Sequence, residues 1–233
     1  IRGARLDEGA RALDVGCGVG GFATWLARER GCQVEAITVV PHHVDAAREL
    51  ALERGVAARC RFRVMDMNAL VSPPGRFDLV VNQETVMYAL DKRDYLARVR
   101  RALVPGGRWH AIDMSIRTGS LSGAERRMHE LACRSWAMTP LLSPPAAIRL
   151  IRGAGFEDVS VEDVTERTLP SARRILEYCD VAERHLSALP EVKLRAVPEL
   201  AALRRHVAGG RAYSLGLLQG VFRHTCYYAR APG

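Results

Sequence analysis

A glycine-rich turn between an expected strand and an expected helix constrains the fold of this chain more than any other feature. The segment ALDVGCGVGG, residues 12–21, passes from apolar residues through Gly16, Gly18 and Gly20 directly into a helical pattern. Glycine permits a tight turn with positive φ and lets the backbone approach a ligand with no Cβ in the way. The G-x-G-x-G-G spacing differs from the dinucleotide fingerprint, whose third glycine comes later. The turn therefore predicts a ligand at the end of the first strand.

The first half of the chain alternates strand and helix patterns, which is typical of a parallel, doubly wound sheet. Strands are expected at residues 11–15, 33–39, 60–66, 77–82, 108–114 and 156–164, with helices from 21, 41, 92 and 144. Pro41 is favourable in a first helical turn, and Asp91 is a favourable N-cap. Two Arg-rich, helical segments, residues 117–140 and 171–208, do not fit the alternation. They predict either a lid over the ligand end of the sheet or surface helices that extend the domain.

Composition excludes several classes of protein. The 233 residues, 48% hydrophobic and 26% charged, suit one globular α/β domain with a small addition. No apolar run approaches the roughly 18–20 residues of a membrane span, and no signal peptide is visible, so we expect a cytoplasmic protein with no membrane partner. The chain begins at Ile1, which suggests that an N-terminal segment is missing.

The net charge of +8 admits an anionic ligand. It also raises a nucleic-acid-binding module as an alternative. No basic stripe with interleaved aromatic residues is present, so no nucleic-acid partner is expected. The six cysteines are dispersed without zinc spacing, so no protein-built metal site is expected.

Further motifs follow the glycine turn in order: VMDMNAL (64–70), FDLVVNQE (77–84), LVPGGRW (103–109) and GAGFEDVSVED (153–163). Together with LDVGCGVGG they resemble the class I S-adenosylmethionine (SAM) methyltransferases from about Ala12 to Val164. The resemblance implies an α/β fold with a Rossmann-like, seven-stranded doubly wound sheet, a helical lid and an antiparallel last strand near residues 221–229. We expect a SAM-binding core at 1–116 and 141–170, the lid at 117–140 and 171–212, and the final antiparallel strand in 213–233.

The resemblance also assigns SAM-binding residues: Gly16, Cys17, Gly18, Thr38, Asp66, Met67 and Gln83. The glycine turn would lie along the methionine part of SAM, and Asp66 and Met67 would frame the adenine. The family usually has an acidic residue at position 38 to bind the ribose hydroxyls. Thr38 weakens that contact, although its hydroxyl can still form a hydrogen bond. The missing acid also argues against NAD.

The segment NQETVMYALD, residues 82–91, resembles the N-x-E-[ST]-x-M-Y pattern of the geranyl diphosphate 2-C-methyltransferase group, and GVFRHTCYYAR (220–230) resembles that group's last strand. This implies methylation of an alkene carbon of a prenyl diphosphate, with Mg2+ held through the diphosphate. Glu84 would accept a proton from the carbocation, with Tyr88 beside it. An alternative role for Glu84 is a hydrogen bond to SAM or a helix cap. The expected substrate-binding residues are Tyr88, Trp136, Phe222 and Arg127.

Other interpretations remain open. The runner-up is an O- or N-methyltransferase of a polyketide, sugar or indole-type natural product, for which His110 is a reserve base. Others are an RNA methyltransferase, which the net charge of +8 raises, and a SAM-binding protein that does not methylate. The expected partner in the leading interpretation is a small molecule, with a homo-oligomer possible.

Overall fold

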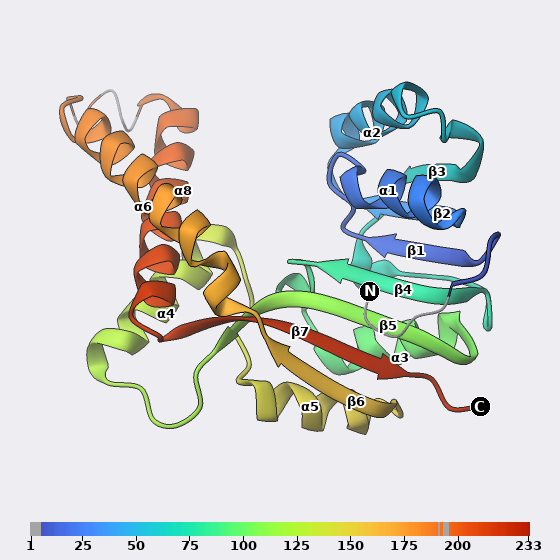
Figure 1. Ribbon diagram of the computed structural model, residues 1–233. Helices are drawn as coiled ribbons and strands as arrows, with labels where there is room; N and C mark the ends of the chain where they lie inside the picture. Colours follow the sequence, from blue (N-terminus) through green and yellow to red (C-terminus); the bar gives the residue numbers. More distant parts are fainter. Residues whose placement is uncertain (1–5, 191, 193–195) are drawn as a thin grey trace. The chain divides into compact units, whose positions relative to one another are not determined.

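The computed structural model describes residues 6–190, 192 and 196–233 and contains one seven-stranded sheet in the order β3-β2-β1-β4-β5-β7-β6 (Figure 1). The strands are β1 (Arg11–Val15), β2 (Gln33–Thr38), β3 (Cys60–Val64), β4 (Phe77–Gln83), β5 (Leu103–Ile116), β6 (Glu157–Asp163) and β7 (Phe222–Arg230). The helices are α1 (Gly21–Arg30), α2 (Pro41–Glu53), α3 (Lys92–Ala102), α4 (Gly123–Trp136), α5 (Pro144–Gly153), α6 (Thr165–Ser187) and α8 (Pro198–Leu218), with 3-10 turns at Ala57–Arg59, Met67–Ala69 and Val86–Tyr88. The expected doubly wound α/β fold is confirmed.

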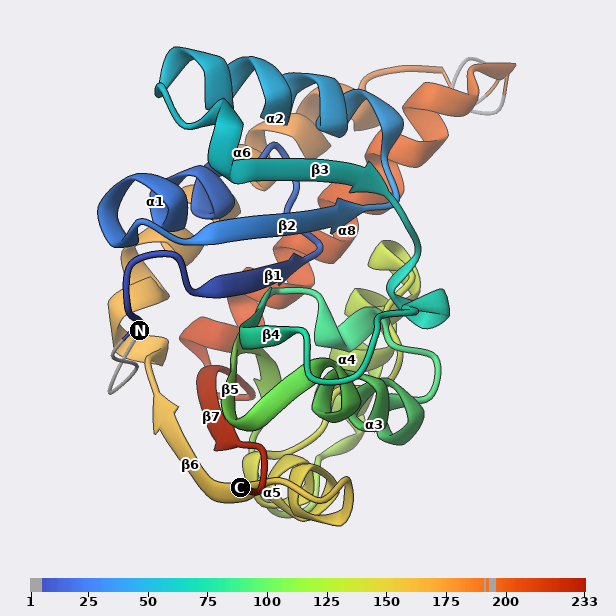
Figure 2. The same ribbon diagram turned by 90° about the vertical axis from the view of Figure 1, so that its right-hand side faces the viewer.

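The register of the parallel strands places the ends of β1, β2 and β4 together. β1 pairs in parallel with both β2 and β4, so that Val15 lies opposite Ile37 on one side and Asn82 on the other. The turns that follow these strands therefore share one edge of the sheet (Figure 2). β7 runs antiparallel to β5, because Ala231 bonds to Gly107 near the start of β5 while Val221 bonds to Arg117 just beyond its end. The expected antiparallel last strand is confirmed.

The chain divides into two compact units. The first comprises Ile1–Asp113, Ala146–Glu162 and Cys226–Gly233, and the second comprises Met114–Pro145 and Asp163–Thr225. α6 begins at Thr165 and contains Pro170, whereas the sequence pattern predicted a helix only from residue 171. α8 continues to Leu218, so residues 213–218 are helical, whereas the sequence analysis placed them in the segment of the final strand. Residues 1–5, 191 and 193–195 of the expected core and lid lie outside the described residues.

Small side chains let the helices of the first unit lie close to its strands. Ala12 of β1, Ala36 of β2 and Ala23 of α1 are fully buried in one hydrophobic cluster. A Cβ on Gly20 would lie 2.8 Å from Ala47 Cβ, so this glycine is required where α1 begins. Burial of this cluster fixes α1 directly after the glycine turn.

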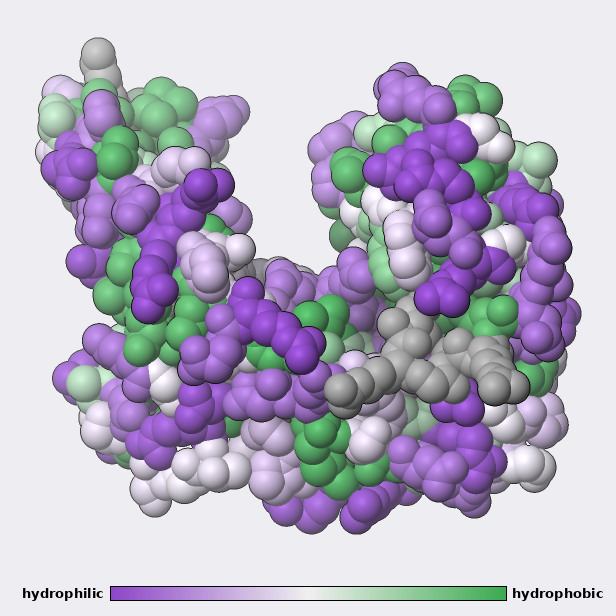
Figure 3. Space-filling view, in the orientation of Figure 1, coloured by the Kyte–Doolittle hydropathy of each residue, from purple (hydrophilic) through white to green (hydrophobic). Residues whose placement is uncertain are grey.

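The second unit is built on helices α4, α6 and α8. A Cβ on Gly209 would approach Ser135 Cβ to 2.6 Å, and one on Gly210 would approach Cys179 Sγ to 2.9 Å. A Cβ on Gly216 would overlap the ring of Phe222. Glycine is therefore what allows α8 to contact α4 and α6 closely. On the face seen in Figure 3, these helices carry hydrophobic residues among hydrophilic ones.

Candidate SAM and acceptor site

The glycine turn is held to the end of β2 by its own backbone. The amides of Gly16 and Cys17 both donate to Ile37 O at 2.9 Å. Gly16, Gly18 and Gly20 have φ of 82°, 53° and 79°, which glycine adopts without strain. The turn predicted from sequence is thus formed, and its backbone is fixed.

Neighbouring side chains leave no room for a Cβ at two glycines of the turn, whereas the space beside the third is free of described protein atoms. A Cβ on Gly16 would overlap Thr85 Cγ2, and Gly20 is closed by α2 as described above. No described protein atom lies within 4 Å of the position a Cβ on Gly18 would take. Gly18 is therefore the position where a ligand can approach the backbone.

Asp14, on β1 before this turn, is a buried acid with an unused oxygen. Its side chain is 2% exposed, and among the described residues its Oδ2 has no hydrogen-bond partner. Burial raises the pKa of Asp14 to about 7, partly offset by a hydrogen bond from the backbone of Ala23. A buried acid with an unpaired oxygen fits a cationic ligand. Together with the open Gly18, Asp14 is consistent with the predicted SAM site.

The predicted ribose and adenine residues lie at the neighbouring strand ends. Thr38, the last residue of β2, is buried, and its Oγ1 accepts a hydrogen bond from Val40 N at 3.3 Å. Asp66 is exposed and uses Oδ1 to accept from Asn68 N at 2.8 Å and Asn68 Nδ2 at 3.0 Å. Met67 is buried. The roles of Thr38, Asp66 and Met67 in binding SAM remain predictions.

Glu84 occupies an unusual backbone conformation at the carboxyl end of β4. Its φ is 53°, in the left-handed region that non-glycine residues rarely adopt. Its amide donates to Ile112 O of β5 at 2.8 Å. Gln83 and Glu84 are both exposed. Such strained residues cluster at functional sites, which is consistent with the predicted role of Glu84.

Tyr88 lies in an acidic environment. Its side chain is partly exposed, and burial raises the pKa of its hydroxyl, with the charges of Asp113 and Glu84 raising it further. Asp113 is buried on β5, and its Oδ2 accepts from Met87 N at 3.1 Å. The charges of two carboxylates therefore act on one neutral phenol, and such a group can stabilise positive charge.

Sequence reasoning did not assign roles to Asn82, Thr85 and Asp113. Thr85 Oγ1 donates to Val15 O at 2.9 Å and accepts from Asn82 Nδ2 at 2.7 Å. A signal for the first two existed, because they are the Asn and Thr of the N-x-E-[ST] pattern. No sequence signal pointed to Asp113, because its contact with the turn after β4 depends on the pairing of β4 with β5.

The remaining predicted substrate residues belong to the second unit. Trp136 is half-buried and donates from Nε1 to His206 O at 3.2 Å, and its ring lies 5.6 Å from that of Tyr213. Phe222 is fully buried and stacks on Tyr213 at 5.8 Å. Arg127 is exposed on α4. Binding of substrate by these residues remains a prediction.

The reserve base His110 is buried, and burial lowers its pKa to about 4. Its ring makes an edge contact with Tyr228 at 4.9 Å. His110 and Asp113 are an odd number of residues apart on β5, so their side chains point to opposite faces of the sheet. His110 therefore does not join the carboxylates near Tyr88.

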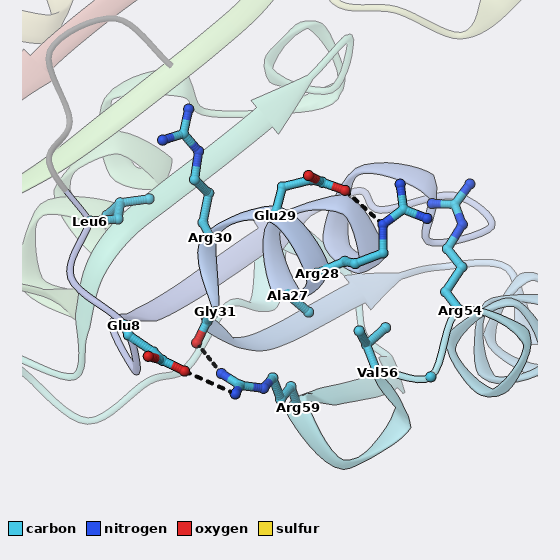
Figure 4. A pocket seen from close by; sticks show the side chains of 11 residues that line it. Leu6, Glu8, Ala27, Arg28, Glu29, Arg30, Gly31, Arg54, Val56 and Arg59 are labelled. Carbon is cyan, nitrogen blue, oxygen red and sulfur yellow. Dashed lines mark hydrogen bonds and ion pairs between the residues drawn. The ribbon is translucent and has the colours of Figure 1, made fainter.

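A pocket of about 500 Å³ lies at the other end of α1 (Figure 4). Arg59 donates to Gly31 O at 2.6 Å and pairs with Glu8 at 3.2 Å, while Arg28 pairs with Glu29 at 2.7 Å. The carboxyl end of the ten-residue α1 lines this pocket, roughly 15 Å along the helix from the glycine turn. It is therefore distinct from the predicted SAM site.

The fold and the glycine turn agree with the class of protein predicted from sequence, and the chain is similar to known methyltransferases. Residues 12–107 match the family described as "Methyltransferase domain". A probable tocopherol O-methyltransferase of rice (Oryza sativa) is 29% identical over 68% of this chain and 45% of its own length. Methyltransferase GfsG of Streptomyces halstedii is 31% identical over 76% of this chain and 64% of its own length. The chain thus spans less than two thirds of both curated relatives. These matches support an enzyme of the SAM-dependent methyltransferase class.

A solved structure with the same fold is geranyl diphosphate C-methyltransferase of Streptomyces coelicolor, in complex with Mg2+, geranyl-S-thiolodiphosphate and S-adenosylhomocysteine. It is 21% identical, with a TM-score of 0.73, and the match covers 97% of this chain and 71% of that one. The expected resemblance to class I SAM methyltransferases that include this group is confirmed. No helix among the described residues is long and apolar enough to cross a membrane.

Asp14 leads to a prediction about pH. Its pKa of about 7 in the folded protein exceeds the value of 3.8 expected when unfolded, so below pH 7 the folded state retains a proton that the unfolded state loses. Stability without ligand should therefore fall as pH rises from about 4 to 7. Cys17, which interacts with Asp14, stays neutral because burial raises its pKa to about 12, and burial likewise raises the pKa of Tyr95.

Because SAM carries a sulfonium charge, it should favour ionised Asp14, and its affinity should rise between pH 6 and 8 by at most about tenfold per unit. Titration calorimetry of the unchanged protein and of Asp14→Asn measures this dependence. Equal pH slopes for the two proteins would contradict the assignment.

Proposed function

We propose that this protein is a SAM-dependent C-methyltransferase that methylates an alkene carbon of a prenyl diphosphate. The observation that carries the proposal is the turn after β4, where Glu84 is held in a left-handed backbone with φ of 53° and the charges of Glu84 and Asp113 raise the pKa of the Tyr88 hydroxyl. The end of β4 is joined to that of β1, and so to the glycine turn, by the bond from Thr85 to Val15. A carbocation formed at this edge would be stabilised by these carboxylates.

SAM, when bound, supplies an electrophilic methyl group on a positively charged sulfur. The π electrons of the alkene would form the new carbon–carbon bond as the bond between sulfur and the methyl group breaks, so that S-adenosylhomocysteine leaves and a carbocation remains on the substrate. Loss of a proton from the adjacent carbon to the Glu84 carboxylate restores a double bond. The neutral ring of Tyr88 offers a π face to the cation. Gly16, Cys17, Gly18, Thr38, Asp66, Met67 and Gln83 are the residues that would hold SAM.

Mg2+ belongs to this proposal through the substrate. Among residues 6–190, 192 and 196–233, no three His, Cys, Asp or Glu side chains are arranged to hold a metal ion. The diphosphate would therefore supply the anionic ligands. Arg127, which is exposed on α4, is the proposed guanidinium partner, whereas Arg117 is paired with Glu125 at 2.8 Å and Arg126 donates to Leu121 O. Trp136 and Phe222 remain the proposed aromatic residues of the substrate site.

A second candidate is O-methylation of a phenolic small molecule. It is favoured by the rice relative, whose name is that of a tocopherol O-methyltransferase. Glu84 would then take the proton of the acceptor hydroxyl. Such a reaction does not depend on a diphosphate-bound metal ion.

One substrate panel tests both candidates. The protein should add one methyl group, detected by mass spectrometry, to at least one of the five-, ten- or fifteen-carbon prenyl diphosphates in the presence of SAM and Mg2+. EDTA should abolish this turnover. Methylation of phosphate-free phenols, unaffected by EDTA and without any reaction of the diphosphates, would replace the first candidate with the second.

A further inference from the structure

The side-chain amide of Asn82 is bonded on all sides in the interior of the first unit. The side chain is 1% exposed. Its Oδ1 accepts hydrogen bonds from the Tyr95 hydroxyl and from Trp109 Nε1, each at 2.9 Å. Its Nδ2 donates to Thr85 Oγ1 at 2.7 Å and lies 3.4 Å from Val15 O. The amide is thereby fixed in one orientation, because rotation would leave buried polar groups unpaired.

Thr85 continues this network to the glycine turn. Its hydroxyl donates to Val15 O at 2.9 Å, and Val15 is the residue directly before Gly16. Its Cγ2 fills the space that a Cβ on Gly16 would occupy. Thr85 also directly follows Glu84 in sequence. Thr85 therefore contacts the glycine turn and the residue before it through its methyl and its hydroxyl, and the proposed base Glu84 is the residue before Thr85.

Glu84 needs such support, because a left-handed backbone costs a non-glycine residue free energy and persists only where surrounding contacts impose it. The amide of Glu84 is held by Ile112 O at 2.8 Å. Further along the turn, Met87 N is held by Asp113 Oδ2 at 3.1 Å. Thr85 lies between these two attachments and adds the link to β1.

We propose that Asn82 and Thr85 are positioning residues that set the distance between the glycine turn, where the methyl donor SAM would bind, and the Glu84 carboxylate. This inference rests on the proposed role of Glu84 as the proton acceptor. Methyl transfer is sensitive to alignment, and a misplacement of about 1 Å can cost about 10²-fold in rate. Neither residue needs to touch the substrate for this role.

Two substitutions at one position separate the hydroxyl from the shape of the side chain. Thr85→Val keeps the Cγ2 methyl group but replaces the hydroxyl with a second methyl, which removes the hydrogen bonds to Val15 and Asn82. Thr85→Ser keeps the hydroxyl and removes the methyl. We expect Thr85→Val to lower kcat by about 10- to 10²-fold with little change in the KM for SAM. Thr85→Ser should retain most of the turnover. Amide hydrogen exchange in residues 83–88 should be faster in Thr85→Val alone.

Thr225→Val is a matched control, since it removes a buried hydroxyl pair with Ser115 of 2.7 Å outside this network. Thr225→Val should lower the Tm by about 2–4 °C, as Thr85→Val should, but leave kcat unchanged. Equal loss of turnover in Thr85→Val and Thr85→Ser, or in Thr85→Val and Thr225→Val, overturns the proposal.

The proposed function and this inference can fail separately. If the unchanged protein methylates none of the tested acceptors, the proposed function fails, and hydrogen exchange then decides the inference. Faster exchange in residues 83–88 of Thr85→Val, and not of Thr85→Ser, supports it. Unchanged exchange in both variants overturns it.

Discussion

Replacing Glu84 with glutamine is expected to lower turnover by at least about 10²-fold, because the amide cannot accept the proton that the carboxylate takes. Glutamine has the same size and can follow the same left-handed backbone, for which φ is 53°. SAM binding, measured by calorimetry, should therefore change little. The measurement is single-turnover product formation with saturating SAM and the preferred acceptor.

Glu84→Asp provides the matched control, since it keeps the carboxylate but withdraws it by one methylene. Aspartate also tolerates the left-handed conformation better than most residues. Turnover between that of the unchanged protein and that of Glu84→Gln is expected. Full activity of Glu84→Gln would show that another group accepts the proton.

Replacing Gly16 with alanine is expected to unfold much of the site. The new Cβ would overlap Thr85 Cγ2, and φ at this position is 82°. The strain alone costs about 1–2 kcal/mol, and displacement of the partly buried Thr85 adds to it. Urea unfolding should show a loss of several kcal/mol, and SAM binding should be undetectable at concentrations that saturate the unchanged protein.

Gly18→Ala is the informative comparison. It carries a similar backbone cost, with φ of 53°, but no described atom lies within 4 Å of the added Cβ. The variant should therefore remain folded, with a Tm a few degrees lower, yet bind SAM weakly because its methyl group enters the ligand's space. If Gly18→Ala bound SAM as tightly as the unchanged protein, the ligand would not lie against this turn.

Local patterns predicted the first half of the fold closely. The expected helix at residues 21–30 agrees with α1, and the N-cap at Asp91 is formed, with Oδ1 accepting from Arg93 N and Asp94 N. These features depend on short-range chemistry of glycine and capping residues. The boundary at 213 was wrong because the small residues of AYSLGLL suit a strand or a helix, and packing of Gly216 against Phe222 decides for a helix.

The candidate site was predictable only in part. Glu84 and Tyr88 could be selected because they belong to one short motif with recognisable chemistry. Asp113 could not, because its contact with Met87 depends on the pairing of β4 with β5, which no local pattern specifies. The conformation of Glu84 was also hidden, since glutamate is not a residue that sequence alone places in the left-handed region.

The glycines of α8 also limit how the helical unit can be altered by engineering. Gly209, Gly210 and Gly216 leave no room for any larger residue on that side. A library designed to widen the interior of this unit for bulkier compounds should therefore keep α8 unchanged. It should instead shorten the side chains opposite, such as Met128, whose Sδ would lie 3.1 Å from a Cβ on Gly216.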